Sequence, residues 1–267
     1  SILARSKVGS IKESLLALLK LSVAVLIPFV LIFAQPDLGS AMVLPPMTLA
    51  ALYASNLSPN FFRAVLGVTL LFVAILAVDL TRYVDFVQKN NLTFHKIEDR
   101  GQYEKESFLP LKDYQRNRIL AFVAPSLVDP SGTGVSWNQK QSLITVGSGG
   151  FAGKGWQEGT QAKLGYLPQT VAHNDLIFSV LAEETGFIGA SSVLVLYSLL
   201  MAMILRAAWR ASDRYGRVLC VGISAILATH IFVNIAMTIG MMPVKGIPLP
   251  FVSYGGSFIL SAFILCG

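Results

Sequence analysis

The sequence predicts an all-α membrane protein, a polytopic bundle of transmembrane helices with a long extracytoplasmic loop. Three observations lead to this fold class. Apolar residues make up 54% of the 267 residues, charged residues only 13%, and the mean hydropathy is +0.61. A soluble domain, by contrast, carries charge on about a quarter of its residues. Several apolar runs also approach the roughly 20 residues that a transmembrane helix needs.

Composition also excludes several classes of protein. The formal net charge is +6, but the basic residues lie at the ends of apolar runs, so we expect membrane lipid as the surroundings and no nucleic-acid partner. Cys220 and Cys266 lie in apolar stretches and provide no disulfide framework. Three scattered histidines argue against a dedicated zinc site.

Six apolar segments are predicted to cross the bilayer. In chain order they are Leu15–Ala34, Gly39–Ser55, Ala64–Leu80, Leu176–Leu205, Val218–Gly240 and one that starts near Ser257. Pro45 and Pro46 remove two backbone donors from the second segment, which is therefore expected to kink. Because the chain opens in a basic stretch and stops inside an apolar run, we interpret residues 1–267 as a single membrane domain truncated at both ends.

The basic residues also predict the orientation of these spans. Three of them precede the first span, and four arginines lie between the fourth and the fifth: Arg206, Arg210, Arg214 and Arg217. The positive-inside rule places both groups in the cytoplasm. The segment 82–175 then forms a large loop on the outer face of the membrane.

This outer loop divides into two parts. Arg82–Leu111 has no apolar periodicity and is interpreted as a mobile insertion. After Asp113 comes a short amphipathic patch that is ended by Pro125 and Pro130; its members are Ile119, Leu120, Phe122 and Val123. A glycine-rich stretch follows between positions 147 and 159.

The glycine-rich stretch invites comparison with a phosphate-binding loop, but it lacks two features of that motif. Ser148 stands six residues before Lys154 where the motif has glycine, and Lys154 is followed by Gly155 instead of Ser or Thr. We therefore favour a tight turn. Backbone donors together with Lys154 remain able to hold a phosphate without the full motif.

Polar residues near the predicted spans have both structural and functional interpretations. Glu183 and Glu184 either face a wet cavity or occupy an interfacial first turn. His230 and Asn234, four residues apart, share one helix face and favour an interhelical hydrogen-bond pair over a proton relay. Asp175, just before the fourth span, has the position of an ordinary helix N-cap. Burial under a polar lid would instead raise its pKa towards that of a useful base.

Several segments, taken in their order along the chain, resemble the SEDS family (shape, elongation, division and sporulation) of bacterial peptidoglycan polymerases. The segments are Gln35-Pro-Asp-Leu-Gly-Ser40, Tyr114-Gln-Arg-Asn-Arg-Ile119, Gly147-Ser-Gly-Gly150, Gly159-Thr-Gln161, His173-Asn-Asp175, Ala182-Glu-Glu184 and Gly240-Met-Met-Pro-Val-Lys-Gly-Ile-Pro-Leu-Pro250 with Val252-Ser-Tyr-Gly-Gly-Ser257. The elongation branch, RodA, is favoured over the division branch, FtsW. One departure lies at Asn174 and Leu176, where the family commonly has Thr and Phe.

The resemblance implies a ten-span fold, of which this chain holds about six spans, in the bacterial cytoplasmic (inner) membrane. It further implies polymerisation of the lipid-linked precursor lipid II into glycan strands for cell elongation and shape. Asp175 aligns with the family's essential aspartate and is the candidate general base. The candidate substrate contacts are Lys154, Arg116 and Arg118 for the diphosphate, with Gln161, Glu183, Ser253 and Tyr254.

The resemblance leaves the cofactor open, with a divalent cation such as Mg²⁺ or Mn²⁺ as the alternative to none. The partners that it implies are a class B penicillin-binding protein and other membrane proteins of the elongation complex. Two further functions suit many spans and carboxylates near the membrane: a flippase or transporter for the lipid-linked precursor, and a non-catalytic scaffold for a transpeptidase.

Overall fold

The computed structural model describes residues 23, 25–28, 30–32, 43–54, 59–90, 92, 101–130, 132, 134, 136–167 and 172–267. The chain forms two compact units. The first contains residues 1–57 and 141–267, and the second contains residues 58–140. All regular elements of the described residues are helices, as expected for a membrane-embedded bundle.

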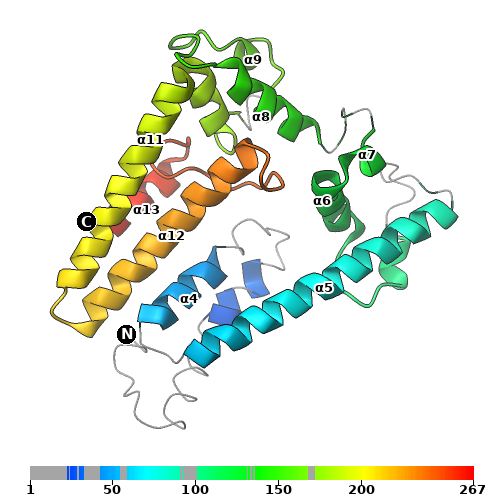
Figure 1. Cartoon of the computed structure of the whole chain (residues 1–267), viewed down its shortest axis with the longest axis horizontal. Helices are drawn as coiled ribbons and strands as arrows, with labels where there is room; N and C mark the ends of the chain where they lie inside the picture. Colours follow the sequence, from blue (N-terminus) through cyan, green and yellow to red (C-terminus); the bar gives the residue numbers. More distant parts are fainter. Residues whose placement is uncertain are drawn as a thin grey trace. The chain divides into compact units, whose positions relative to one another are not determined.

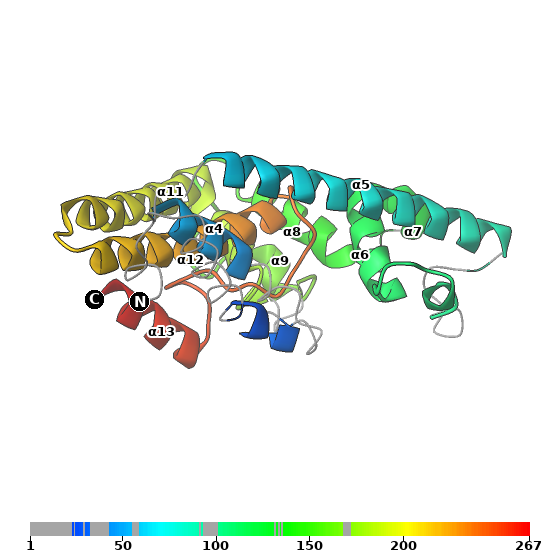
Figure 2. The same ribbon diagram turned by 90° about the horizontal axis from the view of Figure 1, so that it is seen from below.

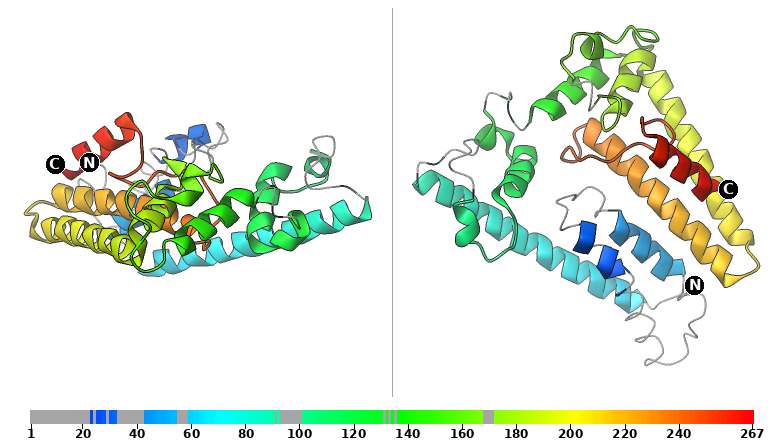
Figure 3. Two further views of the ribbon diagram at one scale, coloured as in Figure 1. Left: turned by 90° about the horizontal axis from the view of Figure 1, so that it is seen from above. Right: turned by 180° about the vertical axis from the view of Figure 1, so that it is seen from behind.

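The first unit is built around two long apolar helices, α11 (Ile177–Arg210) and α12 (Arg214–Thr238). They run side by side in opposite directions, joined by a short turn (Figures 1 and 2). Its other helices are α4 (Leu44–Ala54), which packs on α12, α9 (Thr160–Lys163), α13 (Gly256–Cys266) and most of α8 (Trp137–Ser148). Figure 3 shows α13 on one side of the α11–α12 pair.

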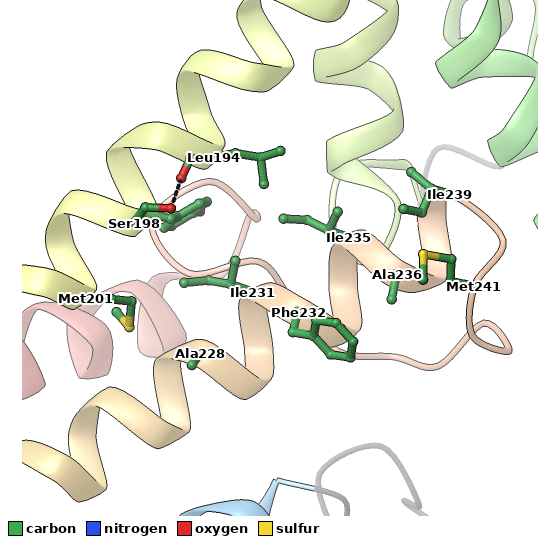
Figure 4. Close-up of a pocket in the computed structure, with 11 residues that line it drawn as sticks. Leu194, Ser198, Met201, Ala228, Ile231, Phe232, Ile235, Ala236, Ile239 and Met241 are labelled. Atoms are coloured by element: carbon green, nitrogen blue, oxygen red, sulfur yellow. Dashed lines mark hydrogen bonds between the residues drawn. The ribbon is translucent and has the colours of Figure 1, made fainter.

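Packing between α11 and α12 produces the largest core of this unit. Its buried members are Phe178, Tyr197, Leu227, Ile231 and Leu249. Beside this core, an apolar groove of about 270 Å³ runs along the two helices, with Leu194 and Met201 on α11 facing Ile231 and Ile235 on α12 (Figure 4). The Ser198 hydroxyl in this groove donates to Leu194 O of its own helix at 2.8 Å, so no polar group there requires a partner from outside (Figure 4).

The second unit consists of α5 (Pro59–Lys89), the 3₁₀ turn η2 (Tyr103–Lys105), α6 (Asp113–Val123), α7 (Pro125–Val128) and the first turn of α8. The C-terminal part of α5 packs against η2 and α6. Its core consists of Tyr83, Val87, Tyr103, Leu120, Ala121 and Val128. α7 begins with Pro125, where a missing backbone donor has no consequence, and only Ala124 separates it from α6.

These helices confirm the predicted membrane bundle. Among the described residues, three helices are long and apolar enough to cross a membrane: Asn60–Lys89, Ile177–Arg210 and Arg214–Thr238. They correspond to the third, fourth and fifth predicted spans. α4 and α13 are shorter apolar helices within the second and sixth predicted spans. The first predicted span, Leu15–Ala34, and the turn at Gln35–Ser40 lie largely outside the described residues.

Two sequence-based expectations about these elements were wrong. The prolines of the second span do not kink a helix, because α4 begins at Leu44 and holds Pro45 and Pro46 in its first turn. The segment Arg82–Leu111 is only partly irregular, because α5 continues to Lys89 and Tyr103 is buried in the core of the second unit. The missed helix end follows from the charged residues of this stretch, which hide the apolar stripe that Tyr83 and Val87 contribute.

Candidate active site

The best candidate for a reacting group is Asp175, in the turn that leads into α11. Three consecutive backbone carbonyls of this turn each accept one hydrogen bond from a different donor. His173 O accepts from the Tyr254 N–H at 3.0 Å, Asn174 O from the Ser253 hydroxyl at 2.6 Å and Asp175 O from the Asn234 side-chain amide at 2.9 Å. The backbone on both sides of the Asp175 side chain is therefore held by α12 and by the loop after it.

The Asp175 carboxylate is partly buried, and none of the described residues donates a hydrogen bond to it. Gly246 stands beside it: a Cβ added at Gly246 would lie 3.5 Å from one carboxylate oxygen and 3.9 Å from the other. Burial raises the pKa of Asp175 above the ordinary value for aspartate. A carboxylate with a raised pKa and an open side is suited to accept a proton.

The alternative that Asp175 caps α11 is wrong. The N-cap of α11 is Leu176, and no side chain makes a capping hydrogen bond there. Leu176 is itself fully buried, in a small core with Leu167, Ala172 and Val180. The Asp175 side chain thus has no capping role. Its backbone carbonyl instead accepts a hydrogen bond from Asn234 on α12.

A second carboxylate, Glu183 in α11, has the opposite surroundings. It is fully buried, and its Oε1 accepts four hydrogen bonds: from Lys154 Nζ at 2.6 Å, Gln161 N at 3.1 Å, Ser148 Oγ at 3.2 Å and Thr160 Oγ1 at 3.2 Å. The Lys154 ammonium also donates to Ser148 and Thr160. This ion pair therefore binds the glycine-rich segment and α9 to α11.

The helix α11 is interrupted beside this ion pair, at Gly186, which has φ 67° and ψ −167°. The glycine-rich segment supplies the hydrogen bonds that the helix loses. Lys154 N and Gly155 N donate to Glu183 O and Glu184 O, while Phe187 N and Ile188 N donate to Gly150 O and Phe151 O. A Cβ on Gly153 would lie 2.2 Å from Glu184 O, and one on Gly186 would lie 2.2 Å from Gly153 N. Only glycine permits this backbone contact.

The interruption also divides α11 into two parts, of which the second is long enough to cross a membrane. All 34 residues of α11 would extend over about 51 Å at 1.5 Å per residue, against about 30 Å for a hydrocarbon core. The part from Phe187 to Arg210 extends over about 36 Å, enough to cross with some tilt. The segment before Gly186, which carries Glu183, is then left for the membrane interface. The glycine-rich stretch is a tight turn, as the sequence indicated, and two of its amides are used by α11.

Arg116 lies in the second unit, where it is the centre of a buried polar network. Its side chain is 0% exposed and donates to Asp79 at 2.8 Å and to Asp113 at 3.4 Å. It also donates to Leu111 O and to the Ser107 hydroxyl, and it lies 4.9 Å from the Tyr103 ring. Burial raises the pKa of Asp113. The guanidinium joins α5, the 101–111 segment and α6, so its donors are used within this network and not for a diphosphate.

The other predicted substrate contacts differ in how accessible they are. Arg118 is exposed on α6, with its guanidinium 5.8 Å from the Tyr114 ring. Tyr254 is 81% exposed beside the Asp175 turn. Ser253 is fully buried and accepts from Leu249 N at 2.7 Å, so it holds backbone instead of facing solvent. Gln161 is partly buried beside Glu183.

Sequence reasoning missed the roles of three residues: Asp79 in the second unit, and Asn234 and Gly246 beside Asp175. Asp79 was treated as part of an apolar span, although a carboxylate within such a span indicates a buried cationic partner. Asn234 and His230 do not pair between helices: Asn234 holds Asp175 O, and His230 Nδ1 lies 3.3 Å from Pro248 O. No sequence pattern marks Gly246, because its role is only to leave space beside the Asp175 carboxylate.

The residues present do not form a recognisable metal centre. Among the residues that the structure describes, no group of three or more His, Cys, Asp or Glu side chains comes together. Asp175 is therefore not a member of such a group among the described residues.

Comparison with known proteins gives a consistent result. A family model for FtsW, RodA and SpoVE, described as "Cell cycle protein", matches residues 1–267. The chain is 37% identical over 238 residues to the peptidoglycan glycosyltransferase MrdB of Escherichia coli K12, covering 89% of this chain and 55% of MrdB. It is 32% identical over 289 residues to the peptidoglycan glycosyltransferase RodA of Treponema pallidum, covering 93% of this chain and 66% of RodA.

Two further comparisons agree. A probable peptidoglycan glycosyltransferase FtsW of Trichlorobacter lovleyi is 35% identical over 237 residues, which are 89% of this chain and 52% of that protein. A solved structure described as a peptidoglycan synthase complex that coordinates polymerization and crosslinking superposes with a TM-score of 0.61 at 28% identity, over 92% of this chain and 57% of the other. The chain thus spans between half and two thirds of the length of these relatives.

Proposed function

This chain belongs to the FtsW/RodA/SpoVE family of cell cycle proteins, and we propose that it is a peptidoglycan glycosyltransferase that polymerises lipid II during cell elongation. The observation that carries this proposal is the Asp175 turn. A carboxylate in a turn that is fixed at three successive carbonyls, and whose oxygens accept no hydrogen bond from the described residues, is prepared to take a proton from a substrate. The similar proteins MrdB and RodA are peptidoglycan glycosyltransferases, and this activity supplies the proposed reaction.

In the proposed reaction, Asp175 accepts the proton of the acceptor sugar's 4-hydroxyl. The hydroxyl oxygen then attacks the anomeric carbon of the donor sugar, and the bond from that carbon to the diphosphate oxygen breaks. The electron pair leaves with the lipid diphosphate, so the configuration at the anomeric carbon inverts. The proton on Asp175 passes to solvent. The raised pKa of Asp175 brings this base closer to the working pH, where proton transfer is most effective.

One of the predicted substrate contacts lies in the same unit as Asp175 and suits this reaction. Arg118 belongs to the second unit and stays a diphosphate contact that only the family resemblance implies. The exposed Tyr254, beside the base, offers an aromatic face and a hydroxyl to a sugar. Lys154 would first have to leave Glu183, so we propose it as a contact only if that ion pair opens.

The proposed site requires an orientation in which the Asp175 turn faces outward. Arg206 and Arg210 end α11, and Arg214 and Arg217 lie in the first turn of α12, so one basic connection joins these two spans. The positive-inside rule supports a cytoplasmic position for this connection in the bacterial inner membrane, and an outer position for the loop that follows α5 and continues to residue 175. In a background without Cys220 and Cys266, a cysteine at Lys105 should react with an impermeant reagent in whole cells, and one at Ser212 should not. The reverse pattern contradicts the orientation.

Purified full-length protein provides the direct test of the activity. In detergent, with lipid II and no membrane to cross, a polymerase forms glycan strands, whereas a flippase forms none.

The broken helix α11 is the feature that favours a transporter, because such helices often expose carbonyls to cargo. Here Glu183 O and Glu184 O already accept Lys154 N and Gly155 N, which favours the enzyme. Absence of polymer, together with lipid II transport in vesicles, would replace the proposal.

We further propose a class B penicillin-binding protein, which cross-links glycan, as the partner, along with other membrane proteins of the elongation complex. Support comes from the similar solved structure, described as a complex that coordinates polymerization and crosslinking. The full-length protein should co-purify with such a transpeptidase and polymerise faster in its presence. Equal polymerisation with and without every candidate transpeptidase contradicts an activating partner, and would leave the polymerase assignment intact.

A further inference from the structure

We propose that Asn234, on α12, is the positioning residue of the Asp175 base. This inference rests on the proposed function. Asn234 is 0% exposed, and its Nδ2 donates to two backbone carbonyls, Asp175 O at 2.9 Å and Ile247 O at 2.7 Å. The first carbonyl belongs to the base itself. The second follows Gly246, the residue that stands beside the carboxylate.

One amide therefore fixes both the base and the backbone that it faces. Asp175 comes just before α11 and Ile247 comes well after α12, so neither segment restrains the other through the chain. The bonds of Ser253 and Tyr254 join the same loop to residues 174 and 173, and Asn234 adds the one donor that holds Asp175 itself together with the residue next to Gly246. A hydroxyl group that enters beside Gly246 therefore meets the carboxylate at a distance to which these two Asn234 bonds contribute directly. Displacement of about 1 Å between reacting groups is enough to lower a rate by about 100-fold.

The chemistry of this contact requires a primary amide. Two N–H donors on one uncharged nitrogen bridge two acceptors, whereas a hydroxyl has one hydrogen and a carboxylate has none. The other end of the side chain makes no such contribution. Asn234 Oδ1 is buried and has no hydrogen-bond partner among the described residues. A buried acceptor without a partner lowers stability, so the donor side of this residue is what the site uses.

His230 provides a matched control on the same helix. It lies one turn before Asn234, and its Nδ1 is 3.3 Å from Pro248 O, one residue beyond the second acceptor of Asn234. Its ring also lies 5.2 Å from the Phe258 ring of α13. It thus joins α12 to the same loop, and among the described residues it makes no hydrogen bond to the Asp175 turn. Loss of His230 removes helix-to-loop packing and leaves the carbonyls of residues 173–175 with their donors.

The test compares lipid II polymerisation by full-length protein in detergent for the wild type and for Asn234→Ala, Asn234→Gln, His230→Ala and Asp175→Asn. We expect Asn234→Ala to lower kcat by about 10- to 100-fold, with KM changed less than about threefold, because the base is displaced while the substrate contacts remain. His230→Ala should keep kcat within about threefold of the wild type. Asn234→Gln, which retains both donors, should recover part of the lost kcat.

The thermal unfolding midpoint of each variant distinguishes an effect on the position of Asp175 from a general loss of packing. Asn234→Ala and His230→Ala should lower it by similar amounts, so a difference confined to kcat identifies positioning. Equal kcat for Asn234→Ala and His230→Ala, with Asp175→Asn inactive, overturns this inference and leaves the proposed function standing. An active Asp175→Asn overturns the base assignment itself. If Asn234→Ala does not fold, Asn234→Ser decides: its single hydroxyl hydrogen cannot bridge both carbonyls, so a folded Asn234→Ser with unchanged kcat contradicts positioning.

Discussion

Asp175 and Glu183 are two carboxylates in the same unit, eight residues apart, and their surroundings are opposite. Glu183 is fully buried, with a lysine at 2.6 Å and three further donors on the same oxygen. Asp175 is partly buried, and no described residue donates to its oxygens, although its backbone is held at three carbonyls. In one residue the side chain is fixed by partners; in the other the backbone is fixed and the side chain is left available.

This difference separates a carboxylate that stabilises the fold from one that can take part in proton transfer. A carboxylate surrounded by donors is stabilised in its charged form and has no reason to take a proton. A carboxylate that is desolvated without donors is the better base. The comparison favours Asp175 over Glu183 for proton transfer, and it assigns to Glu183 the task of holding the glycine-rich segment on α11.

Exchange of Asp175 for asparagine should produce the largest effect. Asp175→Asn keeps the backbone hydrogen bonds of the turn but cannot accept a proton, so glycan synthesis from lipid II should fall by about 10²- to 10⁴-fold. The unfolding midpoint should stay close to that of the wild type. Near-normal synthesis by a folded Asp175→Asn protein would transfer the role of base to Glu184, which is partly buried and also near the glycine-rich segment.

Removal of the cation from the other carboxylate should affect stability instead. Lys154→Met leaves Glu183 charged and fully buried, which should destabilise the protein by about 3–5 kcal/mol. Lys163→Met is the matched control, because the Lys163–Glu158 pair at 3.2 Å is exposed and worth at most about 1 kcal/mol. Denaturation midpoints of the two variants measure the two losses of stability. Equal losses in the two variants would show that the buried pair does not hold the segment.

A methyl group on Gly246 should test whether access to Asp175 matters. The added Cβ meets the carboxylate oxygens at 3.5 and 3.9 Å, an ordinary contact distance, so folding should be preserved. It covers the open side of the base, and we expect polymerisation to fall by about tenfold. Gly222→Ala on α12, where nothing lies within 4 Å, serves as the control. Unchanged activity in Gly246→Ala would mean that the acceptor approaches from another side.

The pH dependence of kcat/KM should show the smallest of these effects. Burial raises the pKa of Asp175, and a base acts in its ionised form, so activity is present above the raised pKa and is lost as the pH falls through it. The acidic limb should therefore lie above 3.8, the ordinary value for aspartate. Gly246→Ala, which desolvates the carboxylate further, should move the limb to higher pH. A shift to lower pH would contradict burial as the cause.

Much of the fold was predictable because each span is an independent apolar segment. α11, α12 and α13 begin within four residues of their predicted positions, since their ends coincide with changes from polar to apolar sequence. The end of α5 was not predictable in the same way. Asp79 and Arg82 lie in the continuing helix, and their presence hides the helical stripe of Tyr83 and Val87.

The candidate site was predictable only where a side chain acts through its own chemistry. Asp175 could be singled out from its position and from its alignment with the family. The donors to its turn come from residues 234, 253 and 254, and no local pattern links a backbone carbonyl to a donor so far along the chain. Arg116 was assigned to the diphosphate for a similar reason, because its partner Asp79 lies 37 residues earlier.

The interruption of α11 at Gly186 has a consequence for local unfolding, which amide hydrogen exchange measures. In an unbroken helix, Phe187 N and Ile188 N would bond to Glu183 O and Glu184 O; here segment 150–155 is inserted between those pairs and bonds to all four groups. If the segment withdrew, two carbonyls and two amides would be left without partners at the edge of the bilayer. The amides of Lys154, Gly155, Phe187 and Ile188 should therefore exchange with deuterium as one cooperative unit, although a sequence distance of more than 30 residues separates the two pairs.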